Sequence, residues 1–153
     1  MPVRSDLLGG RDIHQRKASK VGPPAARLAV RLAARVAGAR FLDLFAGSGA
    51  YGLEALSRGA AGGVFVEKNA RTADFIRQNI TAVCKSLGRT PDDLQVVTAD
   101  ATHVMPGEVP DLVFIDPPYE IIREVAPKLF ARLDELLGAK PDALVVFEMP
   151  GEV

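Results

Sequence analysis

Residues 41–68, FLDLFAGSGAYGLEALSRGAAGGVFVEK, contain the clearest structural pattern in this chain. An apolar run at 41–45 predicts a buried strand, and a glycine-rich loop follows it. Residues 50–58 predict a helix, and 63–67 form a second apolar run. Two buried strands joined by a helix make a βαβ unit, in which the strands are parallel. We therefore expect this stretch to be one unit of an α/β domain.

The same alternation continues downstream of this unit. The elements predicted there are a helix at 70–87, strands at 94–98 and 112–115, a helix at 121–137 and a strand at 143–147. Five short apolar runs separated by helices predict a doubly wound, mostly parallel sheet with helices on both faces. In such sheets ligands bind outside the carboxyl ends of the strands.

The N-terminal part differs in charge and pattern from the rest. Residues 1–22 lack periodicity and are predicted to form a basic arm, followed by a single domain at 23–153. Residues 1–40 contain nine Lys or Arg against two Asp, although the whole chain has a formal net charge of zero. A basic segment on an acidic body predicts a polyanionic partner, with a solvated tail as the alternative.

Pro23-Pro24 opens a predicted helix that runs to about Ala37, because proline suits a first helical turn. Helical spacing gives it an apolar stripe and a neighbouring basic stripe. The apolar stripe is Leu28, Leu32 and Val36, and the basic stripe is Arg27, Arg31 and Arg35. The basic stripe is a candidate for substrate binding through RNA phosphates, and a solvated helix face is the alternative.

Composition excludes several classes of protein. The 153 residues suffice for one domain with a proper core. No apolar stretch approaches the length of a membrane span, and no signal peptide is visible. Cys84 is the only cysteine, which excludes an internal disulfide framework and argues against a Cys-based zinc site. A cytoplasmic location is therefore the default expectation. His14 and His103 are isolated in the sequence, so we expect surface or loop positions for them and no metal site.

Four acidic residues lie at or just past the ends of successive predicted strands. They are Asp43, Glu67, Asp100 and Asp116. Because the carboxyl ends of parallel strands meet at one edge of the sheet, this register places all four along a single rim. The sequence therefore predicts a shared binding site there.

The loop GSGAYG, at residues 47–52, matches G-x-G-x-x-G between a strand and a helix. Alone, the match also fits a nicotinamide or flavin cofactor. Asp43, four residues before Gly47, disfavours a nearby pyrophosphate and suits the cationic amino and sulfonium groups of S-adenosylmethionine. Gly49 would supply an N–H to the methionine part. These features favour S-adenosylmethionine as the cofactor.

Two further acidic residues are candidates for binding the nucleoside part of this cofactor. Glu67 would accept hydrogen bonds from both ribose hydroxyls. Asp100 would accept from the adenine amino group, and the Ala101 N–H would reach a ring nitrogen. The alternatives are a surface charge for Glu67 and a helix cap for Asp100. We also expect Phe45 and Lys68 at the cofactor site.

Asp116-Pro117-Pro118-Tyr119 follows the predicted strand at 112–115. The Asp116 carboxylate and the Pro117 carbonyl can each accept an N–H from an exocyclic base amine, which aims the nitrogen lone pair at a methyl carbon. The prolines restrict φ and hold these acceptors in place. Tyr119 can stack on a base that has left its own stack, and Pro118 is expected beside it. The alternative is a plain turn with Tyr119 packed on a neighbour.

These motifs resemble the class I S-adenosylmethionine-dependent methyltransferases, and more narrowly the bacterial 16S ribosomal RNA guanine-N2 methyltransferase family. The resemblance is carried by 41–79 and by DLVFIDPPYE at 111–120, and it covers about residues 40–150. It implies that Asp116, Pro117 and Tyr119 contact a flipped guanine. It also implies that Asp43, Gly47, Gly49, Glu67 and Asp100 line the cofactor site.

The chain departs from the family pattern in two places. Lys20-Val21-Gly22-Pro23-Pro24 stands near the position of the family's Arg-Pro-Thr motif, so RNA selection is expected to differ. The antiparallel strands that complete this fold are missing before Val153. We expect either a fragment or a last strand that is an exposed edge.

The resulting hypothesis is methyl transfer from S-adenosylmethionine to the N2 amine of a guanine in small-subunit ribosomal RNA. The partner would be ribosomal RNA or the small subunit, and we expect a monomer. One alternative is an adenine-N6 methyltransferase on DNA or RNA, since DPPY also occurs there. The other is a non-catalytic RNA-binding relative with the same fold.

Overall fold

The structure is a computed structural model that describes residues 32–104 and 106–148. The predicted arm at 1–22, Arg27, Arg31 and most of the helix predicted from Pro23 lie outside the described residues. The elements in chain order are α4 (Ala33–Val36), β1 (Arg40–Leu44), α5 (Ala50–Ser57), β2 (Gly62–Glu67), α6 (Ala70–Leu87), β3 (Leu94–Thr98), η1 (Ala101–His103), β4 (Leu112–Ile115), η2 (Tyr119–Ile121), α7 (Ile122–Leu137) and β5 (Leu144–Phe147).

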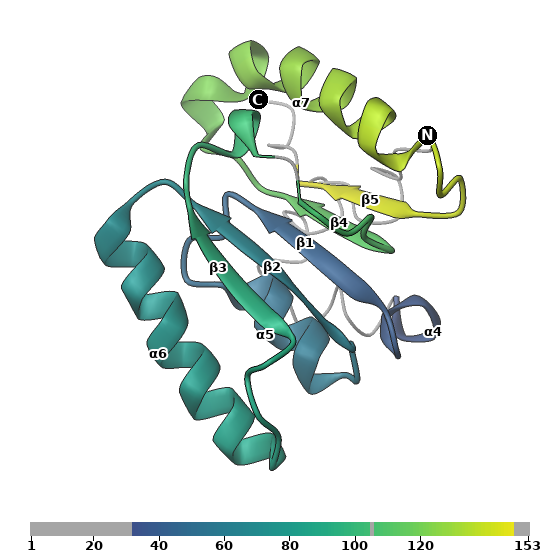
Figure 1. The fold of residues 1–153 in the computed structure, drawn as a ribbon. Helices are drawn as coiled ribbons and strands as arrows, with labels where there is room; N and C mark the ends of the chain where they lie inside the picture. Colours follow the sequence, from purple (N-terminus) through teal and green to yellow (C-terminus); the bar gives the residue numbers. More distant parts are fainter. Residues whose placement is uncertain (1–31, 105, 149–153) are drawn as a thin grey trace, which may run out of the picture.

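The five strands form one parallel sheet in the order β3-β2-β1-β4-β5 (Figure 1). The register pairs Leu44 of β1 with Val66 of β2 and with Ile115 of β4. It also pairs Ile115 with Phe147 of β5. The strands therefore end level, and the residues that follow them emerge along one rim. The strand order reverses between β1 and β4, which is where such sheets bind ligands. The predicted doubly wound α/β class is confirmed.

Helices α5 and α6 cover one face of the sheet, and α7 covers the other (Figure 1). On α6, Ile76, Ile80 and Cys84 recur at helical spacing, are buried, and belong to the same core cluster as Phe41 and Phe65 of the sheet. The cysteine is thus packed in the core. Within the described ranges, no helix combines the length and the apolar character needed to cross a membrane.

The opposite core forms in the same way. Val125, Leu129, Leu133 and Leu137 repeat every four residues along α7 and pack with the buried strand residues of the other sheet face. Because β4 is buried on both faces, its sequence is a continuous apolar run.

Some element boundaries differ from the prediction. The strand predicted at 41–45 ends at Leu44, because Phe45 takes a left-handed backbone with φ of 57°. The helix predicted from 121 begins at Ile122, because a short 3-10 turn at 119–121 precedes it. Leu32 and Val36, predicted on the core face of the first helix, are buried as expected.

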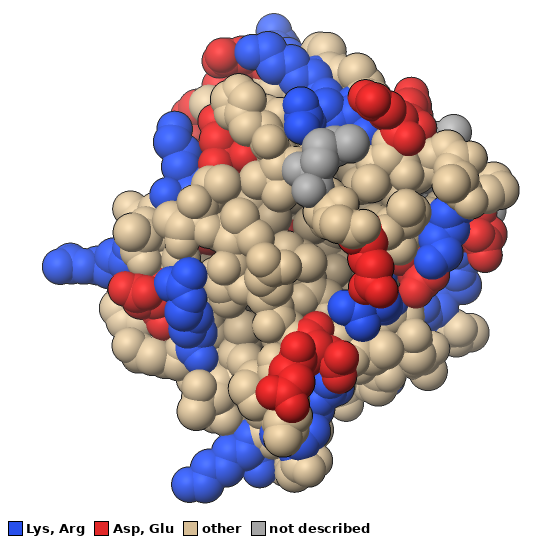
Figure 2. All heavy atoms as spheres, viewed as in Figure 1, with Lys and Arg blue, Asp and Glu red and all other residues tan. Residues whose placement is uncertain are grey.

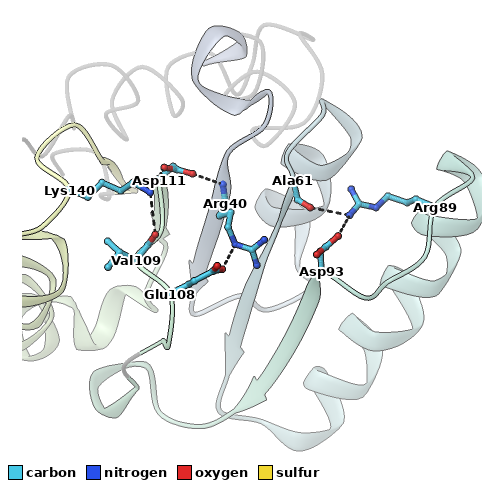
Figure 3. A network of polar contacts seen from close by, with 8 residues as sticks. All are labelled: Arg40, Ala61, Arg89, Asp93, Glu108, Val109, Asp111 and Lys140. Atoms are coloured by element: carbon cyan, nitrogen blue, oxygen red, sulfur yellow. Dashed lines mark hydrogen bonds and ion pairs between the residues drawn. The ribbon is translucent and has the colours of Figure 1, made fainter.

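Polar contacts fix the end of the sheet opposite the carboxyl rim (Figure 3). The backbone N–H of Arg40 donates to Asp111 Oδ2 at 2.9 Å, and Lys140 Nζ pairs with Asp111 Oδ1 at 2.6 Å. These contacts join the starts of β1 and β4 to the turn before β5. On the other side, Arg89 donates to the Ala61 carbonyl at 3.1 Å and pairs with Asp93 at 3.6 Å.

Gly52 is the position in α5 where a side chain would conflict most with the core. An added Cβ would lie 2.6 Å from Phe41 Cε1 and 2.8 Å from Phe65 Cζ, two rings that already pack edge to face at 5.1 Å. We therefore expect Gly52→Ala to lower the free energy of unfolding by about 1–3 kcal/mol in urea denaturation. Gly107→Ala is the matched control, because no atom lies within 4 Å of its added Cβ. A Gly52→Ala chain as stable as the wild type would contradict this packing.

Candidate functional site

A cavity of about 1230 Å³ lies at the carboxyl ends of the strands. It is lined by the loops that follow β1, β2, β3 and β4 and by the start of α7, and it exceeds the usual volume of a single small-molecule site. The predicted site residues that line it are Phe45, Gly47, Glu67, Lys68, Asp100, Ala101, Asp116, Pro117, Pro118 and Tyr119. The structure therefore brings both sequence motifs to one cavity.

The glycine-rich loop after β1 changes direction through residues in the left-handed backbone conformation. After Phe45, Gly47 has φ of 56° and Gly49 has φ of 81°, a region that glycine adopts without strain. Gly49 is the N-cap residue of α5 and is buried, and an added Cβ there would lie 3.3 Å from side-chain atoms of Ile76 and Phe65. Gly47 therefore faces the cavity, whereas Gly49 is not among its lining residues.

Glu67 is held by two backbone groups at the end of β2. Its Oε1 accepts from the Gly47 N–H at 3.0 Å, and its Oε2 accepts from the Asn69 N–H at 2.7 Å. Each carboxylate oxygen has a second lone pair, so Glu67 keeps acceptor capacity toward the cavity that it lines. The two contacts orient the carboxylate before any ligand arrives.

Asp100 caps the short turn η1 and also lines the cavity. Its Oδ1 accepts from the Thr102 hydroxyl at 2.7 Å and from the Thr102 N–H at 2.8 Å. These hydrogen bonds lower the pKa of Asp100, with a further contribution from nearby His103 and Lys68. The carboxylate is therefore charged at neutral pH, and its Oδ2 lies 3.8 Å from Nδ1 of the exposed His103.

Asp43 takes a different place from the one predicted. It is 1% exposed, lies behind the glycine loop, and is not among the cavity-lining residues. Its Oδ2 accepts from the Gly52 N–H at 3.0 Å. Removal from water raises the pKa of Asp43 to about 8; the bond from Gly52 acts against this rise, and the charge of Asp116 adds to it. At neutral pH Asp43 is thus a neutral acid that supports the first turn of α5, rather than an anion facing a ligand.

The Asp116–Tyr119 tip stands at the mouth of the cavity, directly after β4. Pro117 is buried, and the Pro118 carbonyl accepts from the Ile121 N–H at 3.1 Å, which starts η2. Tyr119 is 52% exposed at the rim. The tip is therefore fixed on its protein side, with an aromatic ring presented outward.

Tyr51 and Glu148 are residues that sequence reasoning missed. Tyr51 lines the cavity, and its ring stacks on Phe114 with centroids 5.5 Å apart and an interplanar angle of 21°. Glu148 directly follows β5 and is 7% exposed. The sequence did contain a signal for Glu148. It directly follows the predicted strand at 143–147, just as acidic residues lie at or just past the ends of the other predicted strands.

Arg35 is the described member of the predicted basic stripe. Its guanidinium donates to the backbone carbonyl of Asp142, before β5 and thus at the end of the sheet opposite the cavity. The structure therefore does not bring Arg35 to the site. On the face drawn in Figure 2, basic and acidic side chains are interspersed around an uncharged centre.

Comparisons with known proteins show the family of this chain. Residues 5–153 match the model of a family described as conserved hypothetical protein 95. The chain is 37% identical over 90 residues to ribosomal RNA small subunit methyltransferase D of Escherichia coli, covering 58% of this chain and 42% of that protein. The Haemophilus influenzae protein of the same name is 34% identical over 112 residues, with 70% and 54% covered. The chain thus spans about half the length of these curated relatives.

Among solved structures, the chain is similar to a protein of Escherichia coli provisionally named methyltransferase yhhF. The TM-score is 0.60 with 29% identity, covering 83% of this chain and 65% of that one. The five-stranded sheet and its flanking helices are those of the Rossmann-like methyltransferase fold. The chain belongs to the family described as conserved hypothetical protein 95, which has the fold of the class I methyltransferases.

Proposed function

We propose that this chain transfers a methyl group from S-adenosylmethionine to the exocyclic N2 amine of a guanine in small-subunit ribosomal RNA. The observation that carries the proposal is that one cavity is lined both by the acceptors Glu67 and Asp100 and by the Asp116–Tyr119 tip. The names of the curated relatives, which are methyltransferases of the small ribosomal subunit RNA, support the substrate class.

The residues at one end of the cavity suit S-adenosylmethionine. Nothing lies within 4 Å of the position of a Cβ on Gly47, so a ligand can approach its backbone closely. Glu67 would accept from the ribose hydroxyls, and Asp100 with Ala101 would face the adenine. When bound, the cofactor supplies a methyl group activated by its bond to a sulfonium.

The tip would act by positioning the amine. The Asp116 carboxylate and the Pro117 carbonyl accept its two N–H groups, which favours a pyramidal nitrogen with its lone pair aimed at the methyl carbon. Tyr119 stacks on the base that has left its helix. Because the tip is fixed by proline and by the Pro118 carbonyl contact, these acceptors need little reorganisation.

Replacing Glu67 tests the cofactor half of the site. We expect Glu67→Ala to weaken the binding of S-adenosylhomocysteine about 10- to 100-fold, because charge-assisted hydrogen bonds to the ribose are lost and the N–H groups of Gly47 and Asn69 lose their acceptor. Calorimetric titration measures the dissociation constant. Asp74→Asn, at an exposed carboxylate on α6, is the control. Equal affinities of the Glu67 variant and the wild type would argue against this role.

The substrate is tested by offering labelled S-adenosylmethionine with small ribosomal subunits, naked ribosomal RNA, DNA and protein in parallel. Label on the ribosomal RNA, free or assembled, supports the proposal. Label only on DNA would favour the adenine-N6 alternative. Cofactor binding without label on any acceptor would favour a non-catalytic relative.

A further inference from the structure

Tyr51 lies between the cofactor loop and the catalytic tip. It stands in the first turn of α5, and its ring stacks on Phe114 of β4. Side chains alternate along a strand, so Phe114 and Asp116, two residues apart, point to the same side of the sheet. The Tyr51 ring therefore covers the sheet directly before the catalytic carboxylate.

Glu148 is placed next to Asp116 by the strand register. Ile115 pairs with Phe147, and the Glu148 N–H continues this ladder by donating to the Ile115 carbonyl at 2.8 Å. Asp116 and Glu148 thus directly follow two neighbouring strands, β4 and β5, at the same level of the sheet. The Tyr51 ring, stacked on Phe114, therefore lies on the side of the sheet where both carboxylates follow their strands. Burial raises the pKa of Tyr51, and its hydroxyl is close enough to Glu148 and to Asp116 for their charges to raise this pKa further.

We propose that Tyr51 is a positioning residue for methyl transfer, holding the Glu148 carboxylate beside Asp116 so that both carboxylates stabilise the positive charge that develops on the substrate nitrogen. This inference rests on the proposed function. In the transfer, a nitrogen–methyl bond forms as the sulfur–methyl bond breaks, and that bonding pair stays on sulfur as a neutral thioether. The positive charge passes to nitrogen, which then releases a proton to Asp116 or to water.

The phenol of Tyr51 suits this role because it remains neutral. Burial raises the pKa of Tyr51 well above its usual value, and the carboxylates of Glu148 at the end of β5, Asp116 after β4 and Asp43 on β1 raise it further. Tyr51 therefore stays a hydrogen-bond donor at neutral pH. It fixes the position of Glu148 without cancelling the negative charge that stabilises the nitrogen.

Tyr51→Phe removes the hydroxyl and keeps the ring stacked on Phe114. We expect kcat on ribosomal RNA to fall about tenfold, with unchanged KM and unchanged affinity for S-adenosylhomocysteine. Glu148→Gln should lower kcat at least as much, and adding Tyr51→Phe to it should cause little further loss, since the two residues act as a unit.

The outcomes separate this inference from the proposed function. If the wild type is active and Tyr51→Phe has an unchanged kcat, the role of Tyr51 is overturned and the proposed function still stands. A loss confined to KM, to cofactor affinity or to thermal stability would overturn the role of Tyr51 as well. A wild type that transfers no methyl group to any RNA would count against both proposals.

A second readout needs no substrate. The chain has two tyrosines, so in a Tyr119→Phe background ultraviolet difference titration reports Tyr51 alone. We expect Tyr51 to ionise well above the ordinary pKa of about 10, and Glu148→Gln to bring its ionisation down. Circular dichroism of the same samples shows whether the chain is still folded. Ionisation near 10 in the folded protein, unaffected by Glu148→Gln, would overturn the inference.

Discussion

Asp116→Asn is expected to lower kcat for methyl transfer by about a thousandfold while leaving the affinity for S-adenosylhomocysteine within about twofold. Asn keeps the shape of the side chain but removes the negative charge. It also presents an amide N–H₂ where the substrate amine needs an acceptor. Because Asp116 lies after β4, away from Glu67 and Asp100, cofactor contacts should survive.

The measurement is single-turnover methyl transfer together with calorimetric binding of S-adenosylhomocysteine. Glu135→Gln on the exposed side of α7 is the matched control, since it also neutralises one carboxylate but is not among the cavity-lining residues. Full activity of Asp116→Asn would contradict the mechanism. A parallel loss of cofactor binding would mean that Asp116 supports the cofactor rather than the amine.

The buried Asp43 is expected to make the free energy of unfolding depend strongly on pH. Its pKa is about 8 in the fold and 3.8 when unperturbed. Between these values the unfolded chain loses the proton while the folded chain keeps it. Stability therefore falls as pH rises through this window, with a slope of at most about 1.4 kcal/mol per pH unit from this group. Below pH 3.8 both states are protonated, and above about 8 both are ionised, so the contribution is flat outside the window.

Asp43→Asn removes this titration while its side-chain oxygen can still accept from the Gly52 N–H. We expect the free energy of unfolding of the variant, relative to that of the wild type, to rise between pH 4 and pH 8 by an amount on the order of 4 kcal/mol. Urea denaturation at several pH values measures it. Asp134→Asn, at an exposed carboxylate on α7, should follow the wild type at each pH. A constant difference between Asp43→Asn and the wild type would contradict a buried, neutral Asp43.

The parallel sheet and the position of the DPPY tip could be predicted because they depend on local patterns. Apolar runs such as 112–115 are short and buried on both faces, and a motif after such a strand must emerge at the carboxyl rim. The same reasoning placed Glu67 and Asp100 at the cavity. It needed only the direction of each strand.

The role of Asp43 could not be predicted in this way. Its position in β1 points the side chain at the start of α5, and whether it meets a ligand or the Gly52 N–H depends on how closely that helix packs. Gly52 packs closely against Phe41 and Phe65, which brings its N–H to Asp43. The hydrophobic periodicity of the sequence does not predict this close packing.

The pairing of Tyr51 with Glu148 depends on which strands are neighbours. Sequence alternation predicts five strands, but it does not show that β5 lies beside β4, and only that adjacency sets Glu148 next to Asp116. Tyr51 occupies a position of the G-x-G-x-x-G motif at which any residue type is allowed, so the motif gave no reason to select it. A count of acidic residues after every predicted strand would have indicated Glu148.

Nucleoside analysis of ribosomal RNA methylated by the wild-type chain identifies the atom that accepts the methyl group. Digestion of the labelled RNA and separation of its nucleosides should place the label on N2-methylguanosine, with Asp116→Asn giving almost none. Label on N6-methyladenosine, or equal labelling by the Asp116 variant, would contradict the claim that this tip directs methyl transfer to the guanine amine.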